Sequence, residues 1–203
     1  MTTALLMRPS TFDEGVAQLR KARDETAPAR AAPLPDDVPP RVLLWRAVDR
    51  LVGDEAFLHG MRLLYDANQI VSFLYNSIVP HLEERLRFSK LQDDYDKAKK
   101  KPENIQQNTA RFEAIVQSLR EADATSVAQR KVDADFAAMR QGVRPLSSDA
   151  VVLSGLRIVY VSSKTARGCL DLMFERLLEA LQNDTKIVPT TDIPMHVLLM
   201  GGP

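Results

Sequence analysis

The chain has 203 residues, a formal net charge of zero and 45% apolar residues. This composition excludes a globally disordered chain, and the zero net charge does not give the positive footprint expected of a general nucleic-acid binder. With one cysteine, no disulfide can form within the chain, so we expect a reducing intracellular compartment, the cytoplasm or an organelle matrix.

Residues 1–26 are predicted to form an N-terminal arm that carries one short helix. Thr11 and Glu14 have the spacing of a capping box, which marks the beginning of a helix. Residues 27–40 contain five of the twelve prolines, a density that favours an extended linker over a helix. We therefore expect the arm either to be mobile or to dock on the rest of the chain or on a partner.

Residues 41–183 are predicted to form an antiparallel bundle, which gives an all-α fold of four to six helices, some of them long. Only eight glycines are present, and because glycine is costly inside a helix, their scarcity favours this fold class. Residues 41–52 are apolar around most of the helix circumference, which is typical of a helix buried in its own core or in a partner. Leu44 and Trp45 are therefore candidates for core packing or for an interface with a partner.

Three further helical stretches follow this first helix of the bundle. One is predicted from residue 55 to residue 79, where Pro80 either ends the helix or kinks it. Residues 81–101 are amphipathic and carry acid-before-base pairs at i,i+4 spacing, which support a helix. Pro102 ends this stretch, and residues 103–141 are again predicted to be helical.

The last long helix is predicted to end at Gln182 and to carry a seam of apolar residues at steps of three and four. The seam consists of Leu153, Leu156, Tyr160, Leu170, Phe174, Leu177 and Leu181. Leu156 and Phe174 are two further candidate interface residues. The run Ile158–Val161 favours a strand locally, so a strand followed by a helix is the alternative for residues 151–182.

Residues 184–203 lose the helical pattern and are predicted to form an extended tail with a short apolar end. An apolar segment of this kind usually docks on another surface, because a free one would be a sticky patch. Apolar runs along the chain are interrupted well before the ~20 residues that cross a bilayer, so we expect no transmembrane segment.

The spacing of reactive residues does not predict a catalytic centre. None of His59, His81 and His196 has a second histidine at i+3 or i+4, and Cys169 has no cysteine or histidine within four residues. A buried and inert Cys169 is favoured over a reactive thiol activated by nearby cations. We therefore expect no catalytic residues, no metal and no cofactor, although a pocket holding His59 or Cys169 beside a carboxylate would favour an enzyme.

The basic cluster Lys97, Lys99, Lys100 and Lys101 comes at the predicted end of a helix, where cations meet unpaired carbonyl groups. Each lysine near an anionic membrane contributes about 1 kcal/mol, so these residues are candidates for an anionic surface. Nucleic acid is disfavoured, because no aromatic residues interleave with the lysines. Residues 90–112 (KLQDDYDKAKKKPENIQQNTARF) resemble the middle of a BAR domain, and this resemblance implies a helical dimer that binds curved membranes.

The sequence favours a non-catalytic protein–protein interaction module, a subunit or adaptor of a larger assembly. The helix at 41–52, the tethered arm and the apolar tail together suggest more apolar surface than one small bundle hides. The predicted partners are other protein chains, in a hetero-complex or a homodimer. The alternative is a BAR-like dimer that binds an anionic membrane through a lysine-rich hairpin tip.

Overall fold

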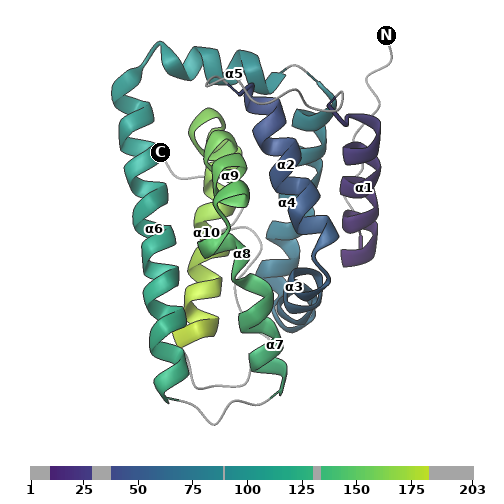
Figure 1. Cartoon of the computed structure of the whole chain (residues 1–203), viewed down its shortest axis with the longest axis vertical. Coiled ribbons are helices and arrows are strands. Elements are labelled where there is room, and N and C mark those ends of the chain that lie inside the picture. Colours follow the sequence, from purple (N-terminus) through teal and green to yellow (C-terminus); the bar gives the residue numbers. More distant parts are fainter. Residues whose placement is uncertain (1–9, 29–37, 89, 130–133, 183–203) are drawn as a thin grey trace.

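The computed structural model describes residues 10–28, 38–88, 90–129 and 134–182, and every regular element in these ranges is a helix (Figure 1). The all-α prediction is therefore confirmed. The prediction of four to six helices is wrong, because these ranges contain ten helical segments. They are α1 (Phe12–Glu25), α2 (Pro40–Gly53), α3 (Glu55–Ala67), α4 (Gln69–Arg87), α5 (Lys90–Lys99), α6 (Pro102–Gln129), α7 (Ala134–Val143), α8 (Pro145–Ser148), α9 (Ala150–Ser162) and α10 (Lys164–Gln182). Residues 29–37 of the predicted linker and the predicted tail 184–203 lie outside the described residues.

Several consecutive helices are separated by one extended residue, and two of these joints, Asn68 and Ser163, divide stretches that were predicted to be single helices. These single-residue joints are Asp54, Asn68, Asp149 and Ser163. Each side chain caps the helix that follows: Asn68 Oδ1, for example, accepts from the backbone N–H of Ile70 at 2.9 Å and of Val71 at 3.2 Å. Because the cap satisfies donors at the beginning of a helix that would otherwise be unpaired, the chain can end one helix and begin the next within one residue.

Two alternatives left open by the sequence are resolved. Residues 150–162 form α9, so a strand in this region is wrong; Asp149 caps the helix, and helical packing overrides the local preference of the β-branched run. Pro80 lies inside α4, which continues to Arg87, so the proline does not end the helix.

Glycine lets two pairs of helices approach each other closely. A Cβ added at Gly60 of α3 would lie 2.8 Å from the Cα of Gly142 in α7, so the two backbones touch. A Cβ added at Gly155 of α9 would lie 2.7 Å from the Leu43 carbonyl oxygen in α2. Only a residue without a Cβ allows such contacts, and these crossings therefore set the spacing of α3 to α7 and of α2 to α9.

The N-terminal helix α1 packs on α4 and α2. It buries one face, which consists of Phe12, Val16, Leu19 and Ala22. The indole Nε1 of Trp45 donates to the Arg23 carbonyl oxygen at 2.8 Å, and Tyr75 donates its hydroxyl to the Phe12 carbonyl oxygen at 3.3 Å. In this structure the described part of the arm, residues 10–26, is thus a docked helix, held by apolar burial and by polar contacts near both ends of α1.

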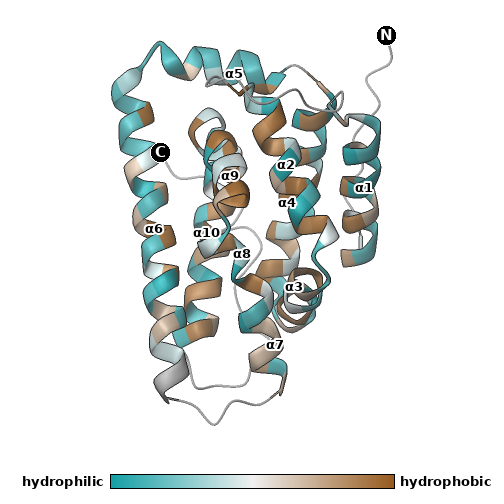
Figure 2. Ribbon diagram, viewed as in Figure 1, coloured by the Kyte–Doolittle hydropathy of each residue, from teal (hydrophilic) through white to brown (hydrophobic). Residues whose placement is uncertain are grey.

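The remaining helices enclose a common core. In Figure 1, α6 lies along one side of the molecule, α5 lies across one end, and α9 and α10 lie between α6 and the pair α2 and α4. The helix faces that point inward are mostly hydrophobic, whereas the outer faces of α1 and α6 are mostly hydrophilic (Figure 2). Within the described ranges, no helix is both long enough and apolar enough to cross a lipid bilayer.

Candidate functional site

A groove with a volume of about 480 Å³ lies between α6 and α9. Its lining consists of Phe112, Glu113, Val116, Gln117, Arg120, Ala150, Leu153, Ser154 and Arg157. On both helices these residues recur at steps of three and four, the spacing that places side chains on one face. The groove therefore runs along the facing sides of α6 and α9.

The floor of this groove is apolar. Phe112 and Val116 are buried, and Leu153 is partly buried against the core. The small residues Ala150 and Ser154 lie one turn apart on α9, which leaves room above the floor. An incoming apolar side chain that reaches the floor would contact the carbon atoms of Phe112, Val116 and Leu153.

Charged and polar side chains form the rim. Arg157 and Glu113 face each other across the groove with 3.6 Å between Nη1 and Oε1, and both side chains are substantially exposed. Arg120 donates from Nε to the Ser147 carbonyl oxygen at 2.7 Å. Because that acceptor is neutral, it does not compensate the charge of Arg120. The rim contains two arginines and one glutamate, so its net charge is positive.

A partly buried network, in which Arg111 is exposed and Tyr160 is buried, links the helices around the groove. Tyr160 in α9 donates its hydroxyl to Asp171 Oδ1 in α10 at 2.6 Å, and Arg111 in α6 pairs with Asp171 Oδ2 at 2.7 Å. Burial and the bond to Asp171 raise the pKa of Tyr160 well above its usual value, so the phenol stays protonated and keeps donating. Phe112 packs on Tyr160 with 5.2 Å between ring centroids, so the floor rests directly on this network.

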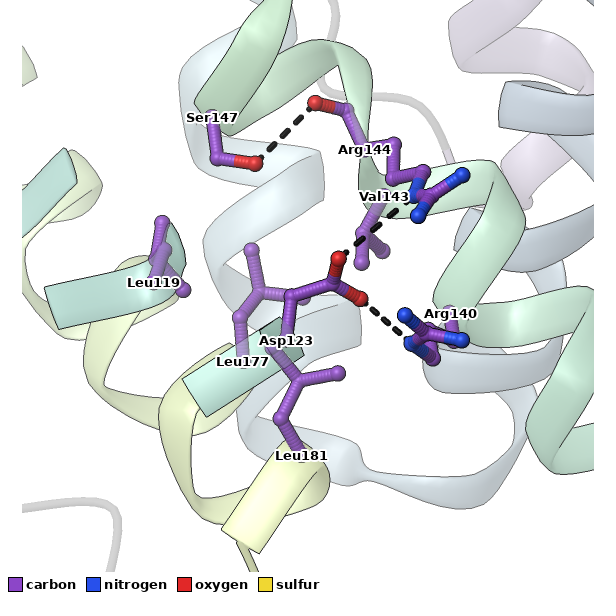
Figure 3. A pocket seen from close by; sticks show the side chains of 8 residues that line it. All are labelled: Leu119, Asp123, Arg140, Val143, Arg144, Ser147, Leu177 and Leu181. Carbon is purple, nitrogen blue, oxygen red and sulfur yellow. Dashed lines mark hydrogen bonds and ion pairs between the residues drawn. The ribbon is translucent and has the colours of Figure 1, made fainter. Parts of the chain in front are cut away.

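A second polar cluster joins α6 to α7 around Asp123 (Figure 3). Its carboxylate accepts from Arg140 and, at 3.5 Å, from Arg144. The hollow beside it has a volume of only about 10 Å³, which is close to the least space that one water needs. This cluster is therefore best explained as an ion-pair brace between helices.

A third cluster brings His81 of α4 to the joint between α9 and α10. The imidazole Nε2 lies 3.1 Å from Ser163 Oγ, which also accepts from the backbone N–H of Ala166 at 3.2 Å. Burial lowers the pKa of His81, and the positive charge of Arg85 acts in the same direction, which favours the neutral ring. Ser163 is buried and its oxygen caps α10, so the pair supports the joint rather than presenting a nucleophile to solvent.

The structure places the predicted interface residues mainly in the interior. Leu44, Leu156 and Phe174 are buried in the core, so they reach another molecule only if the helices separate. Trp45 is half-buried and binds the arm through Arg23. These residues hold the chain's own helices together in this structure.

The remaining candidates are dispersed. All four lysines, Lys97, Lys99, Lys100 and Lys101, are exposed where α5 meets α6 at one corner of the molecule (Figure 1). The ammonium group of Lys99 lies 4.8 Å from the centre of the Tyr95 ring. His59 is exposed on α3 and Cys169 is half-buried on α10, and neither lines the groove or the hollow beside Asp123; His196 lies outside the described residues.

Sequence reasoning missed the groove, since its walls come from helices about 40 residues apart in the chain. The pair of small residues Ala150 and Ser154 beside Leu153 is the one local sign of it in the sequence. Over the described part of the chain, no group of three metal-ligating side chains is assembled. No model of a known protein family matches the chain, and searches of curated proteins and of solved structures find no match either.

Proposed function

We propose that this chain is a non-catalytic protein-interaction module, a subunit or adaptor of a larger assembly, and that it docks an amphipathic helix of a partner protein in the α6–α9 groove. The observation that carries the proposal is the combination of an apolar floor with a charged rim between two helices. Grooves of this form receive the apolar face of a helix, whose anchors recur at i, i+3, i+4 and i+7.

The length of the groove suits about two turns of such a helix. From Phe112 to Arg120, the α6 side extends over eight residue steps, or about 12 Å at 1.5 Å per step. From Ala150 to Arg157, the α9 side extends over about 10 Å by the same measure. We therefore expect two or three apolar anchors from the partner, with the side chains above Ala150 and Ser154 inserting most deeply.

The charge of the rim defines the flank of the partner helix. Among the described residues, Arg157 forms an exposed pair with Glu113, and exposed pairs contribute little to stability, so a partner carboxylate can compete for the guanidinium. Arg120 provides a second positive group at the other end of the α6 wall. We propose an acidic residue on the partner beside its apolar face, which supplies specificity and faster association.

The proposal includes an antiparallel arrangement of the long helices as the frame that presents the groove. The Tyr160–Asp171–Arg111 network supports this role, because a prearranged surface loses less conformational freedom on binding. A reducing intracellular compartment, the cytoplasm or an organelle matrix, remains the proposed location. The partner is a different chain in a hetero-complex or a second copy in a homodimer.

Site-specific photo-crosslinking tests the groove. A photoreactive amino acid replaces Gln117 at the rim, and the matched control carries it at Lys21, an exposed position of α1. We expect Gln117 to give a product whose partner peptide is an amphipathic helix with an acidic flank. The substitution Ser154→Trp, which fills the groove, should abolish that product while the far-UV circular dichroism spectrum stays unchanged. A product that survives Ser154→Trp, or that appears equally from Lys21, contradicts the proposal.

The exposed lysine corner favours a second candidate, binding to an anionic membrane surface as the BAR resemblance implies. Its test is sedimentation with vesicles of phosphatidylserine and phosphatidylcholine, compared for the native chain and for a variant with Lys99, Lys100 and Lys101 replaced by Glu. Loss of binding in the variant supports this candidate. Equal binding by both proteins removes it, because each lysine should contribute about 1 kcal/mol near such a surface.

A further inference from the structure

An apolar cavity of about 70 Å³ lies between α1 and the body of the molecule. Its walls come from α1, α2, α3, α4, α8, α9 and α10. Apart from Tyr75, every lining side chain is purely aliphatic, a thioether or a phenyl ring. The Tyr75 hydroxyl is already engaged, since it donates to the Phe12 carbonyl oxygen.

A void of this size is unusual in a protein interior. Interiors pack as densely as organic crystals, and voids larger than a water molecule are few. A water inside this one would need two to four polar partners, which the lining does not offer, and apolar cavities of this kind stay dry. Filling the cavity with an apolar group would restore dispersion contacts that its walls now lack.

We propose that this cavity is a binding site for one compact apolar molecule, a short hydrocarbon or a single aromatic ring. A cavity of about 150 Å³ in another protein accepts benzene, so a cavity of half that volume holds about three carbon atoms as it stands, and a six-membered ring once its walls move apart. Met61 and Met173 lie in those walls, and methionine side chains adapt easily to a new shape.

Ligand binding is coupled to the docking of α1. Phe12, Val16 and Leu19 of α1 form one wall, so the complete site exists only when α1 is in place. A ligand that binds only the docked form must stabilise that form in proportion to its occupancy. Trp45 is the chain's only tryptophan, and its indole N–H binds the Arg23 carbonyl oxygen near the end of α1, so its fluorescence reports this docking.

Benzene and xenon serve as probes for the intact chain. We expect saturating benzene to raise the melting temperature by about 3–6 °C at ten times the dissociation constant. Val16→Phe and Val79→Leu enlarge side chains in the cavity wall and should abolish the shift. Val42→Phe enlarges a half-buried side chain of α2 outside the cavity and should preserve it.

A second measurement does not depend on the variants. Xenon should perturb the methyl resonances of Val16, Leu19 and Val79 in the native chain and leave those of Leu153, in the groove, unchanged. Trp45 fluorescence should change with the same xenon or benzene concentration dependence. Absence of a melting shift with both probes overturns the proposal, and so does a shift that persists in Val16→Phe and Val79→Leu.

Discussion

Gly60→Ala tests whether the contact between α3 and α7 limits the stability of the fold. The added Cβ would lie 2.8 Å from the Gly142 Cα and 2.9 Å from the Met139 carbonyl oxygen. Both are backbone atoms, which cannot swing aside as the end of a flexible side chain would. The two helices must therefore move apart, and this movement disturbs the packing on either side of the crossing.

The expected magnitude is a balance of two effects. Replacing glycine by alanine in an open helix interior stabilises a protein by about 0.5–1 kcal/mol, whereas overpacking costs about 1–3 kcal/mol. We therefore expect Gly60→Ala to lower the free energy of unfolding by up to about 2.5 kcal/mol. Gly168→Ala in α10 is the matched control, because its added Cβ meets no heavy atom within 4 Å. The control should raise the free energy of unfolding by about 0.5–1 kcal/mol.

Equilibrium unfolding in urea, followed by far-UV circular dichroism, measures both changes. If the slope of the free energy of unfolding against urea concentration is unchanged, the shift of the midpoint reflects a change in stability and not in the surface that unfolding exposes. The two alanine variants should move the midpoint in opposite directions. If Gly60→Ala is as stabilising as Gly168→Ala, the close contact of the helix backbones is refuted.

Three further substitutions test the polar contacts, each by the same unfolding assay. Tyr160→Phe removes the bond to Asp171 and should lower the free energy of unfolding by about 1.5–3 kcal/mol, so an unchanged midpoint would contradict a role in bracing the groove. Asn68→Ala removes a helix cap and should cost about 1 kcal/mol, whereas no loss would mean that backbone geometry alone makes the joint. Burial and Arg85 lower the pKa of His81, so the unfolded chain binds this proton more tightly. The stability that comes from the neutral ring should be complete above about pH 6.5, the pKa of histidine in the unfolded chain, and should be lost as the pH falls toward the lowered pKa of the folded state. His81→Gln should make the free energy of unfolding less dependent on pH in this range.

The sequence predicted the helical class well but divided the chain too coarsely. The joint at Asp54 agrees with the predicted gap between the helix at 41–52 and the one that begins at residue 55. Asn68 and Ser163 were missed, because apolar residues continue at helical spacing on both sides of them. Apolar periodicity shows which face of a helix is buried. It does not reveal a change of chain direction that is made within a single residue.

The candidate site was harder to predict because it depends on tertiary packing. Leu44 and Phe174 stand out by hydrophobicity, and the strongest apolar residues are those that a chain buries first. The groove instead depends on small and charged residues such as Ser154 and Arg157, whose importance appears only when α6 lies opposite α9. No local pattern specifies that pairing, because it results from the packing of every helix between them.

The single-residue joints at Asp54, Asn68, Asp149 and Ser163 have a practical consequence for anyone who tags or reengineers this protein. An extended residue spans only about 3.3–3.6 Å, so these junctions contain no slack that could absorb an inserted peptide. A reporter placed there would reorient everything downstream. The direction of each following helix is thus set by the backbone torsion angles of one residue, so an insertion at a joint changes the relative orientation of whole helices.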